Sequence, residues 1–274
     1  KVELLTTLRH PNIVVLMGCC LEEHCLVYEY CGGGSLEERL ADESFPLPWY
    51  TRLRIMMEAA TALLWMHKLD IIHCDIKLAN VLLDESKAAK LEDVGICRMI
   101  SAAEARTARL TSALTLRTSS SEVRGSFGYV DPALFDGSPV EKSSDVYALG
   151  VCLLQLLTKR SAKTVKREMK QAYDSKNLPE ILDRSAGEWP LDTVVEDLAA
   201  LGLRCTEFDQ EMRPDLESEV IPVLSRLNDL GMAAERQELE SLRRAAAAAL
   251  PAPGARPRDS DDILEAQFCC PISQ

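Results

Sequence analysis

Acidic, basic and amide side chains with the spacing of a catalytic site occur in residues 71–95, which read IIHCDIKLANVLLDESKAAKLEDVG. Asp75 is followed by Lys77 and Asn80, two and five residues later. Asp93 lies thirteen residues after Asn80. Phosphoryl transfer depends on positioning the reactants and neutralising phosphate charge, with little covalent work by the protein. A carboxylate, an amine and oxygen ligands for Mg²⁺ meet these needs, so the stretch predicts a phosphoryl-transfer site.

The order of these residues resembles the eukaryotic protein kinase family, whose catalytic loop begins H-R-D, ends in Asn and is followed by D-F-G. The resemblance implies that Asp75 accepts or orients the hydroxyl proton of a protein substrate. Lys77 would offset charge on the transferred phosphate. Asn80 and Asp93 would bind Mg²⁺, with ATP as the second cofactor. Ser126 occupies the position of a family Thr that bonds the catalytic aspartate and lysine, which implies Ser/Thr rather than Tyr substrates.

Further motifs extend the resemblance over roughly residues 1–230. They imply an α+β, protein kinase-like fold, mainly the α-helical C-lobe with a remnant of the N-lobe. LVYEYCGGGSLEERL resembles the hinge and the helix after it, which implies that Glu29 and Cys31 contact the nucleotide. GSFGYVDPALF resembles the end of an activation segment. SSDVYALGVCLLQLLT resembles a central buried helix with its anchoring Asp145, and EMRPDL resembles a late helix carrying Arg213.

Cys74 departs from the family pattern, because it occupies the position of the family's Arg. A neutral thiol cannot pair with a phosphorylated activation loop, whereas Arg does so bidentately. The resemblance is therefore to the kinases that lack this arginine, which are common among plant receptor-like kinases. We do not expect loop phosphorylation to be the on-switch.

Ala133 is a second departure, because the family has a Glu here that pairs with the arginine matching Arg213. Removing one member of such a buried pair typically costs about 3–5 kcal/mol. The sequence therefore predicts that Arg213 lacks this carboxylate partner, and that Ala133→Glu would raise the melting temperature.

Hydrophobic spacing predicts the elements that position these groups. Residues 12–20 and 24–30 predict an antiparallel pair of strands, and residues 49–70 predict a long core helix. The apolar run 147–158 predicts a buried helix that is too short to span a bilayer. Residues 101–124 have no apolar period and predict a loop.

The glycine run 32–34 could indicate a phosphate cradle, but no G-K-[ST] follows it. Ser35 and Glu38 have the spacing of a capping box, in which two side chains bond the first turn of a helix. The run therefore predicts a flexible connector that leads into a helix.

The resemblance divides the chain into four parts. Residues 1–30 are expected to be a kinase N-lobe remnant, with the end of one helix and two strands, and residues 31–231 the C-lobe. Residues 232–262 predict a helix and a disordered linker, because strong helix formers precede a stretch rich in Pro and Asp. Residues 263–274 resemble the start of a truncated U-box.

The U-box resemblance depends on a short motif. The first loop of a U-box reads F-x-C-P-I, matched here by Phe268, Cys270, Pro271 and Ile272. Plant proteins that fuse a receptor-like cytoplasmic kinase domain to a C-terminal U-box have this order of parts. The resemblance implies a U-box E3 ubiquitin ligase/kinase, whose full-length U-box would take an E2 ubiquitin-conjugating enzyme as partner. The alternative is a plain apolar C-terminal tail.

The function implied is that of a Ser/Thr protein kinase-like domain acting on protein hydroxyls. We expect weak or no activity from this stretch alone, because the Gly-rich loop and the lysine that anchors ATP would lie before Lys1. Two alternatives stay open, a non-catalytic pseudokinase scaffold and a regulatory domain of a ubiquitin ligase.

Amino-acid composition limits the possible partners, metal sites and location of the protein. A net charge of −12 over 274 residues argues against nucleic acid as a partner. Ten cysteines without a C-x-x-C pair, and only four histidines, argue against zinc and favour free thiols in a reducing cytosol. With neither a signal peptide nor a membrane span expected, the predicted location is cytoplasmic. Cys31 and Cys97 would lie near the nucleotide cleft, although burial in the core is the commoner fate of such residues.

Overall fold

The computed structural model describes residues 8–20, 22–23, 25–44, 46–93, 98–99 and 126–249. The chain divides into two compact units, Lys1–Met232 and Ala233–Gln274. The first unit is rich in helices, with few and short strands, as the predicted α+β kinase-like fold requires. The strands are β1 (Leu16–Cys20), β2 (Cys25–Tyr28), β3 (Ile71–Ile72), β4 (Val81–Leu83), β5 (Ala89–Leu91) and β6 (Arg98–Met99). The α-helices are α2 (Leu36–Ala41), α3 (Trp49–Lys68), α5 (Lys142–Thr158), α6 (Val165–Asp174), α7 (Glu196–Cys205) and α8 (Ile221–Ala249).

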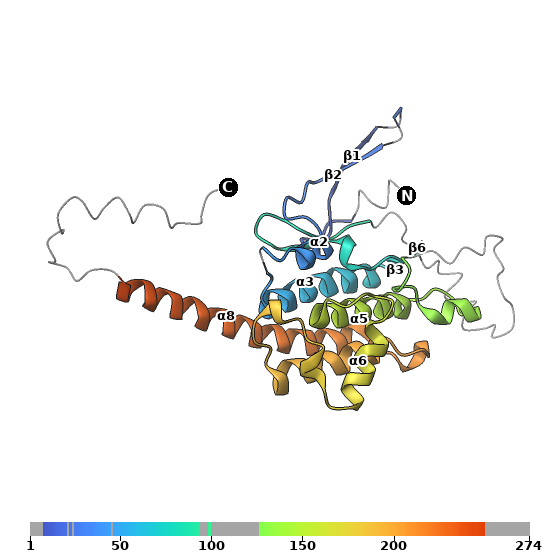
Figure 1. Cartoon of the computed structure of the whole chain (residues 1–274). Helices are drawn as coiled ribbons and strands as arrows, with labels where there is room; N and C mark the ends of the chain where they lie inside the picture. The colour runs from blue at the N-terminus through green and yellow to red at the C-terminus, as the bar shows by residue number, and fades with distance from the viewer. Residues whose placement is uncertain are drawn as a thin grey trace. The chain divides into compact units, whose positions relative to one another are not determined.

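Helix α5 forms the centre of the core, because apolar side chains cover almost its whole circumference. Every residue of α5 from Ser144 to Thr158 is buried, which confirms the buried helix predicted from the apolar run. Helices α3 and α6 pack against α5 (Figure 1). Helix α3 confirms the long helix predicted from helical spacing, and its buried stripe contains Leu53, Met56, Ala60, Leu63 and Met66.

Two glycines allow α5 and α7 to approach closely. A Cβ on Gly150 would lie 2.5 Å from Cys205 Cβ, and a Cβ on Gly202 would lie 2.5 Å from Leu154 Cδ2. Both distances are shorter than any ordinary contact. A Cβ on Gly150 would also lie 3.0 Å from Gly202 O, so that position accepts a larger side chain only if the helices move. This close crossing fixes the place of α5, and with it the buried residues that α5 presents to its neighbours.

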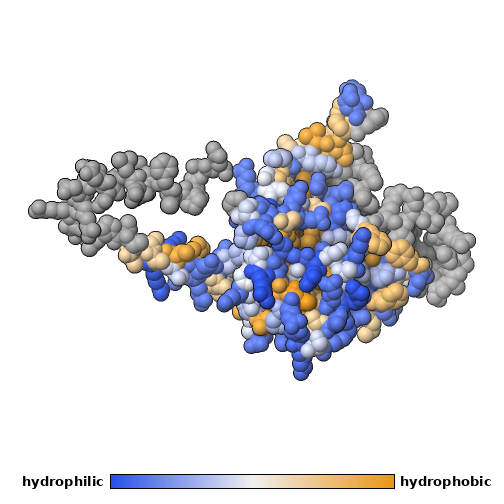
Figure 2. Space-filling view, in the orientation of Figure 1, coloured by the Kyte–Doolittle hydropathy of each residue, from blue (hydrophilic) through white to orange (hydrophobic). Residues whose placement is uncertain are grey.

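The strands β1 and β2 form an antiparallel hairpin, as predicted, with Cys20 opposite Cys25. The hairpin carries exposed hydrophobic residues, seen as orange atoms below a blue tip in Figure 2. Met17, Leu26 and Val27 are 71%, 41% and 50% exposed. Apolar side chains grouped in this way are typical of surfaces that contact other protein segments.

A second hairpin, β4–β5, leads from the predicted catalytic loop to Asp93, pairing Val81 with Leu91. The segment before β1 extends this hairpin, since Val14 N donates to Leu91 O (2.9 Å) and Leu91 N donates to Asn12 O (2.8 Å). Strand β5 therefore has a partner on each side, which holds the backbone leading to Asp93.

The glycine run is a connector, as predicted. Gly33 N donates to Leu83 O (2.9 Å) and Gly34 N to Cys31 O (3.4 Å), so these amides are engaged within the chain. The predicted capping box is confirmed, because Glu38 N donates to Ser35 Oγ and Ser35 N donates to Glu38 Oε2.

Helix α8 is a single helix of 29 residues. It crosses the predicted boundary between residues 31–231, the expected C-lobe, and residues 232–262, where a separate helix was expected. From Arg236 to Ala248 its side chains are exposed, consistent with the run of strong helix formers there. Among the described residues, no helix combines the length and hydrophobicity required to cross a membrane.

The close crossing of α5 and α7 makes a testable prediction. We expect Gly150→Ala to lower the free energy of unfolding by about 1–3 kcal/mol, because overpacking outweighs the roughly 1 kcal/mol that Ala gains in helix propensity. Chemical denaturation of the full chain measures the change. Gly18→Ala is the control, because a Cβ at Gly18 meets nothing within 4 Å. A stability unchanged or increased by Gly150→Ala would show that the helices are not held at this distance.

Candidate active site

One buried carboxylate of α5 fixes the backbone of the predicted catalytic loop. Asp145 accepts hydrogen bonds from His73 N (2.8 Å) and Cys74 N (2.8 Å), one on each oxygen. The ring of His67, from α3, lies 2.8 Å from the same carboxylate. Cys74 has a φ of +70°, in the left-handed region that residues with side chains seldom adopt. The hydrogen bonds from the two backbone amides to Asp145 therefore stabilise a loop conformation that the local sequence alone would disfavour.

Asp75, Lys77 and Ser126 form a closed triangle of hydrogen bonds. Lys77 Nζ lies 2.7 Å from Asp75 Oδ2 and donates to Ser126 Oγ at 2.8 Å. Ser126 donates to Asp75 Oδ1 from both its hydroxyl (3.0 Å) and its amide (3.2 Å). The structure thus brings together three predicted site residues, two from one loop and one from a segment 49 residues away from Lys77.

The environment of Asp75 favours its ionised form. Burial raises the pKa of this carboxyl, but the hydrogen bonds from Lys77, Ser126 and Asn80 outweigh that effect and hold the pKa below its usual value. Asp75 is therefore a carboxylate at neutral pH, the form that can accept or orient a hydroxyl proton.

His73 links this triangle to the segment before Asp93. It is fully buried, and its Nε2 lies 3.0 Å from Glu92 O. A carbonyl oxygen can only accept, so Nε2 carries the proton, while Nδ1 accepts from Asp75 N (3.3 Å). Burial lowers the pKa of His73 even though the charges of Asp145, Asp75 and Asp93 act in the opposite direction. The ring is neutral and takes part in positioning.

Asn80 and Asp93 are the predicted metal ligands. Asn80 Nδ2 donates to Asp75 O (2.8 Å), which directs the other amide atom, Oδ1, away from that carbonyl. Asn80 O accepts from Glu92 N (2.8 Å), which ties Asn80 to the segment that ends at Asp93. Asp93 is exposed, with a φ of +62°. An amide oxygen and an exposed carboxylate fit Mg²⁺, which takes few protein ligands and completes its shell with water and phosphate oxygens.

The predicted hinge residues have structural partners of their own. Glu29 Oε1 accepts from Val15 N (2.8 Å) and pairs with Lys90 Nζ (2.9 Å), so this carboxylate, directly after β2, contacts both the residue before β1 and strand β5. Cys31 is buried, and burial raises the pKa of its thiol, with the charge of Glu29 acting in the same direction. The thiol is therefore protonated and weakly nucleophilic. The predicted contact of Glu29 and Cys31 with a nucleotide stays a prediction.

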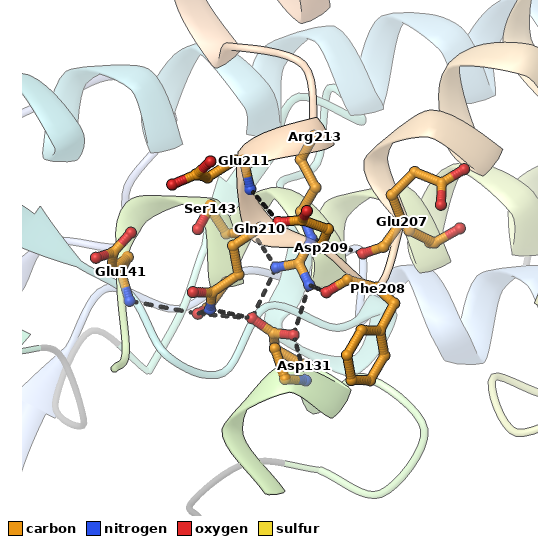
Figure 3. A network of polar contacts seen from close by, with 12 residues as sticks. Asp131, Glu141, Ser143, Glu207, Phe208, Asp209, Gln210, Glu211 and Arg213 are labelled. Carbon is orange, nitrogen blue, oxygen red and sulfur yellow. Dashed lines mark hydrogen bonds and ion pairs between the residues drawn. The ribbon is translucent and has the colours of Figure 1, made fainter. Parts of the chain in front are cut away.

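Arg213 has a carboxylate partner that the sequence analysis did not identify. It forms a bidentate pair with Asp131, with Nη2 2.6 Å from Oδ1 and Nη1 2.7 Å from Oδ2 (Figure 3). The side chains are 1% and 0% exposed. The other donors of Arg213 reach backbone oxygens of Ser143, Glu207 and Phe208. All five N–H groups of the guanidinium are therefore satisfied.

Asp131 forms the ion pair with Arg213 although it lies two residues before Ala133, the position where the family pattern has its Glu. Gln210 also donates to Asp131 Oδ2 (2.7 Å), and Ala133 N donates to Oδ1 (3.0 Å). Burial raises the pKa of Asp131, but the bonds from Arg213, Gln210 and Ala133 outweigh it and keep the pKa below its usual value. The sequence signal that could have identified Asp131 is that it is the one carboxylate within the DPALF motif.

Several predicted features lie outside the described residues. They are Val94 and Gly95, Cys97, the loop 101–124, the first seven residues, the linker within 251–262, and the U-box motif Phe268, Cys270, Pro271 and Ile272.

Comparisons with known proteins agree with this geometry. The family profile described as "Protein kinase domain" matches residues 1–221. Among curated relatives, U-box domain-containing proteins 52 and 34 of Arabidopsis thaliana are 41% and 38% identical, over 83% and 89% of this chain. U-box domain-containing protein 70 of Oryza sativa subsp. japonica is 34% identical over 100% of it. The chain spans 27%, 30% and 32% of the lengths of these three relatives, respectively.

The buried pair predicts a large stability effect. We expect Asp131→Ala to lower the free energy of unfolding by about 3–5 kcal/mol, because it leaves the Arg213 charge buried and unpaired. Urea denaturation at neutral pH measures the loss. Asp174→Ala is the matched control, since its exposed pair with Lys170 should contribute less than about 1 kcal/mol.

The same variant has a predicted pH dependence. A lowered folded-state pKa stabilises the fold above the unfolded carboxyl value of about 3.9, and this contribution is lost as the pH falls through the folded value. The difference between wild type and Asp131→Ala should therefore narrow below about pH 4. Equal stability of the two proteins at neutral pH would contradict the assigned role of Asp131.

The satisfied guanidinium also reverses the expectation for Ala133→Glu. Ala133 is 4% exposed, and Arg213 has no N–H left for a second carboxylate. We expect the substitution to lower the free energy of unfolding by about 1–3 kcal/mol, the cost of an unsatisfied buried polar group. Thermal unfolding followed by circular dichroism measures the change, and a raised melting temperature would restore the original expectation.

Proposed function

The chain belongs to the protein kinase family, and from this premise we propose that it is the Ser/Thr kinase-like domain of a plant U-box ubiquitin ligase/kinase. Its substrates are proteins with a free Ser or Thr hydroxyl, and its cofactors are ATP and Mg²⁺. The similarity to plant U-box proteins over most of this chain supports the proposal that the domain belongs to a U-box protein.

The observation that carries the proposal is the triangle of Asp75, Lys77 and Ser126. The Asp75 carboxylate is ionised, immobilised and adjacent to a lysine ammonium, so a hydroxyl placed beside it meets a proton acceptor and a positive charge together. Asp75 takes or orients the substrate proton while a bond forms between the hydroxyl oxygen and the transferred phosphorus. The bond from that phosphorus to the leaving oxygen of ADP breaks, and Lys77 offsets the negative charge that moves with the phosphate.

Ser126 contributes orientation. Its amide and its hydroxyl each donate a hydrogen bond to Asp75 Oδ1. Its hydroxyl oxygen also accepts a hydrogen bond from Lys77 Nζ, which fixes the position of the ammonium group. Because the carboxylate and the ammonium are held before substrate arrives, little reorganisation is needed during transfer.

Asn80 and Asp93 would hold Mg²⁺ through the oxygen atoms described above. The bound ion supplies charge neutralisation on the phosphates. The residues themselves keep the ion beside the loop, because the Glu92 amide and the Asp75 carbonyl fix Asn80 from two directions.

In the parent protein, the proposed arrangement is a kinase C-lobe over residues 31–231 followed by a helix, a linker and a C-terminal U-box. An E2 ubiquitin-conjugating enzyme would bind the complete U-box, and the proposed location is the cytoplasm. Absence of catalysis in the test below would instead support a pseudokinase scaffold or a regulatory domain of the ligase.

Transfer of labelled γ-phosphate from Mg·ATP to casein tests the kinase proposal directly, and it is measured with the full-length protein because this stretch alone is expected to have weak or no activity. We expect Asp75→Asn and Asp93→Ala each to lower the rate by at least about 100-fold, the scale of a lost acid–base group or metal ligand. Asp174→Asn, an exposed change of the same chemical kind, should leave the rate unchanged.

Two outcomes would overturn the proposal. Full rate in either active-site variant would remove the assigned roles. No transfer by the wild type, together with no thermal shift on addition of Mg·ATP, would favour the scaffold alternative.

A further inference from the structure

A groove of about 440 Å³ lies immediately beyond Ser126, in the segment that follows the catalytic triangle. Residues Phe127, Gly128 and Val130 form one wall, and the N-terminal half of α6 forms the other. Successive residues of an extended chain are about 3.3–3.6 Å apart, so this wall begins within one residue of the hydroxyl that touches Asp75. A substrate whose hydroxyl reaches Asp75 therefore has neighbouring residues within reach of this groove.

The wall of the groove is firmly built. Gly128 has a φ of +101°, and a Cβ there would lie 3.1 Å from both Ala162 C and Lys163 N, so a side chain at this position would press on the backbone before α6. Lys166 donates to Thr206 O and lies over the Tyr147 ring, 5.6 Å from its centroid. These contacts hold Gly128 against the segment before α6, and Lys166 against Tyr147 and Thr206.

Four basic side chains line the groove, in a chain whose net charge is −12. Lys166 is half-buried and engaged with Thr206, whereas Lys163, Arg167 and Lys170 are exposed. Lys163 Nζ lies 4.9 Å from the centroid of the Phe127 ring, and Lys170 makes only an exposed pair with Asp174. Across the part of the chain that the structure describes, Arg167 has no ion-pair partner.

Exposed aromatic rings flank these cations. Phe127 is 76% exposed and Phe135 is 66% exposed. Rings of this kind pack against the backbone and the apolar parts of a bound peptide, while the cations pair with its charged side chains.

We propose that this groove binds an acidic segment of the protein substrate, next to the Ser or Thr that is phosphorylated. The occupant carries Asp, Glu or phosphorylated side chains, because only anions complement Lys163, Arg167 and Lys170 together. The inference rests on the proposed kinase function and adds a substrate class to it.

Local charge decides this recognition. Screening at physiological ionic strength limits charge effects to about 8 Å, so an acidic peptide in the groove meets mainly its cations and little of the overall negative charge. Nucleic acids and anionic membranes select broad basic faces, whereas this cluster is a short concave groove with aromatic walls.

Fluorescence anisotropy with labelled peptides, in the absence of ATP, measures the binding. One peptide contains a Ser flanked by Glu residues, and in two matched peptides Gln or Lys replaces every Glu. We expect the Glu peptide to bind the wild-type chain at least about tenfold more tightly than the Gln peptide, and the Lys peptide to bind most weakly.

A pair of double variants with equal change in net charge locates the site. Lys163→Glu with Arg167→Glu should abolish the preference for the Glu peptide. Arg184→Glu with Arg243→Glu, two exposed arginines that do not line the groove, should preserve it. Circular dichroism confirms that all variants fold.

The inference is overturned if the Glu and Gln peptides bind equally, if no peptide binds, or if both double variants lose the preference alike. It is also overturned if phosphatidylserine vesicles bind through Lys163 and Arg167 and the Glu peptide does not. Transfer from Mg·ATP to the same peptides is measured separately, with the full-length protein. Selective binding without transfer would contradict the kinase proposal alone, whereas transfer to all three peptides without selective binding would contradict this inference alone.

Discussion

The candidate site depends on one carboxylate that never faces the substrate. Asp145 is 1% exposed, and it receives two amide protons from the loop and the ring of His67. A buried carboxylate is stable only when such partners compensate for its lost hydration. The loop therefore takes its shape from helix α5, and α5 in turn is placed by its close crossing with α7. The geometry around Asp75 is thus a consequence of packing in the core.

The Asp131–Arg213 pair applies the same principle at the end of the segment that contains Ser126. There, a planar guanidinium with five satisfied donors holds a loop against the later helices. The chain carries Ala133 where the family pattern has its acidic residue, yet the arginine keeps a full shell. The buried charge of Arg213 is therefore balanced by the whole set of groups around it, and a carboxylate at a neighbouring position can replace the Glu of the family pattern.

Much of this was predictable from the sequence, and the exceptions have a common cause. Helices α3 and α5, the β1–β2 hairpin and the Ser35–Glu38 capping box follow from periodicity and local hydrogen bonding, which operate over a few residues. The identities of Asp75, Lys77 and Asn80 also follow from spacing within one loop. The partner of Arg213 does not, because Asp131 reaches it across 82 residues of sequence. The engagement of Glu29 with Lys90 is likewise a contact between distant segments. Patterns identify residue types, whereas side-chain pairing depends on the assembled fold.

The tautomer of His73 has a consequence for how the loop responds to pH. Protonation of its second nitrogen would remove the acceptor for the Asp75 amide, and the fully buried ring would carry the added charge out of contact with bulk solvent. Mild acidification, which charges an ordinary surface histidine, would leave this one neutral. The loop that carries Asp75 would thus keep its form when the pH falls moderately below neutral.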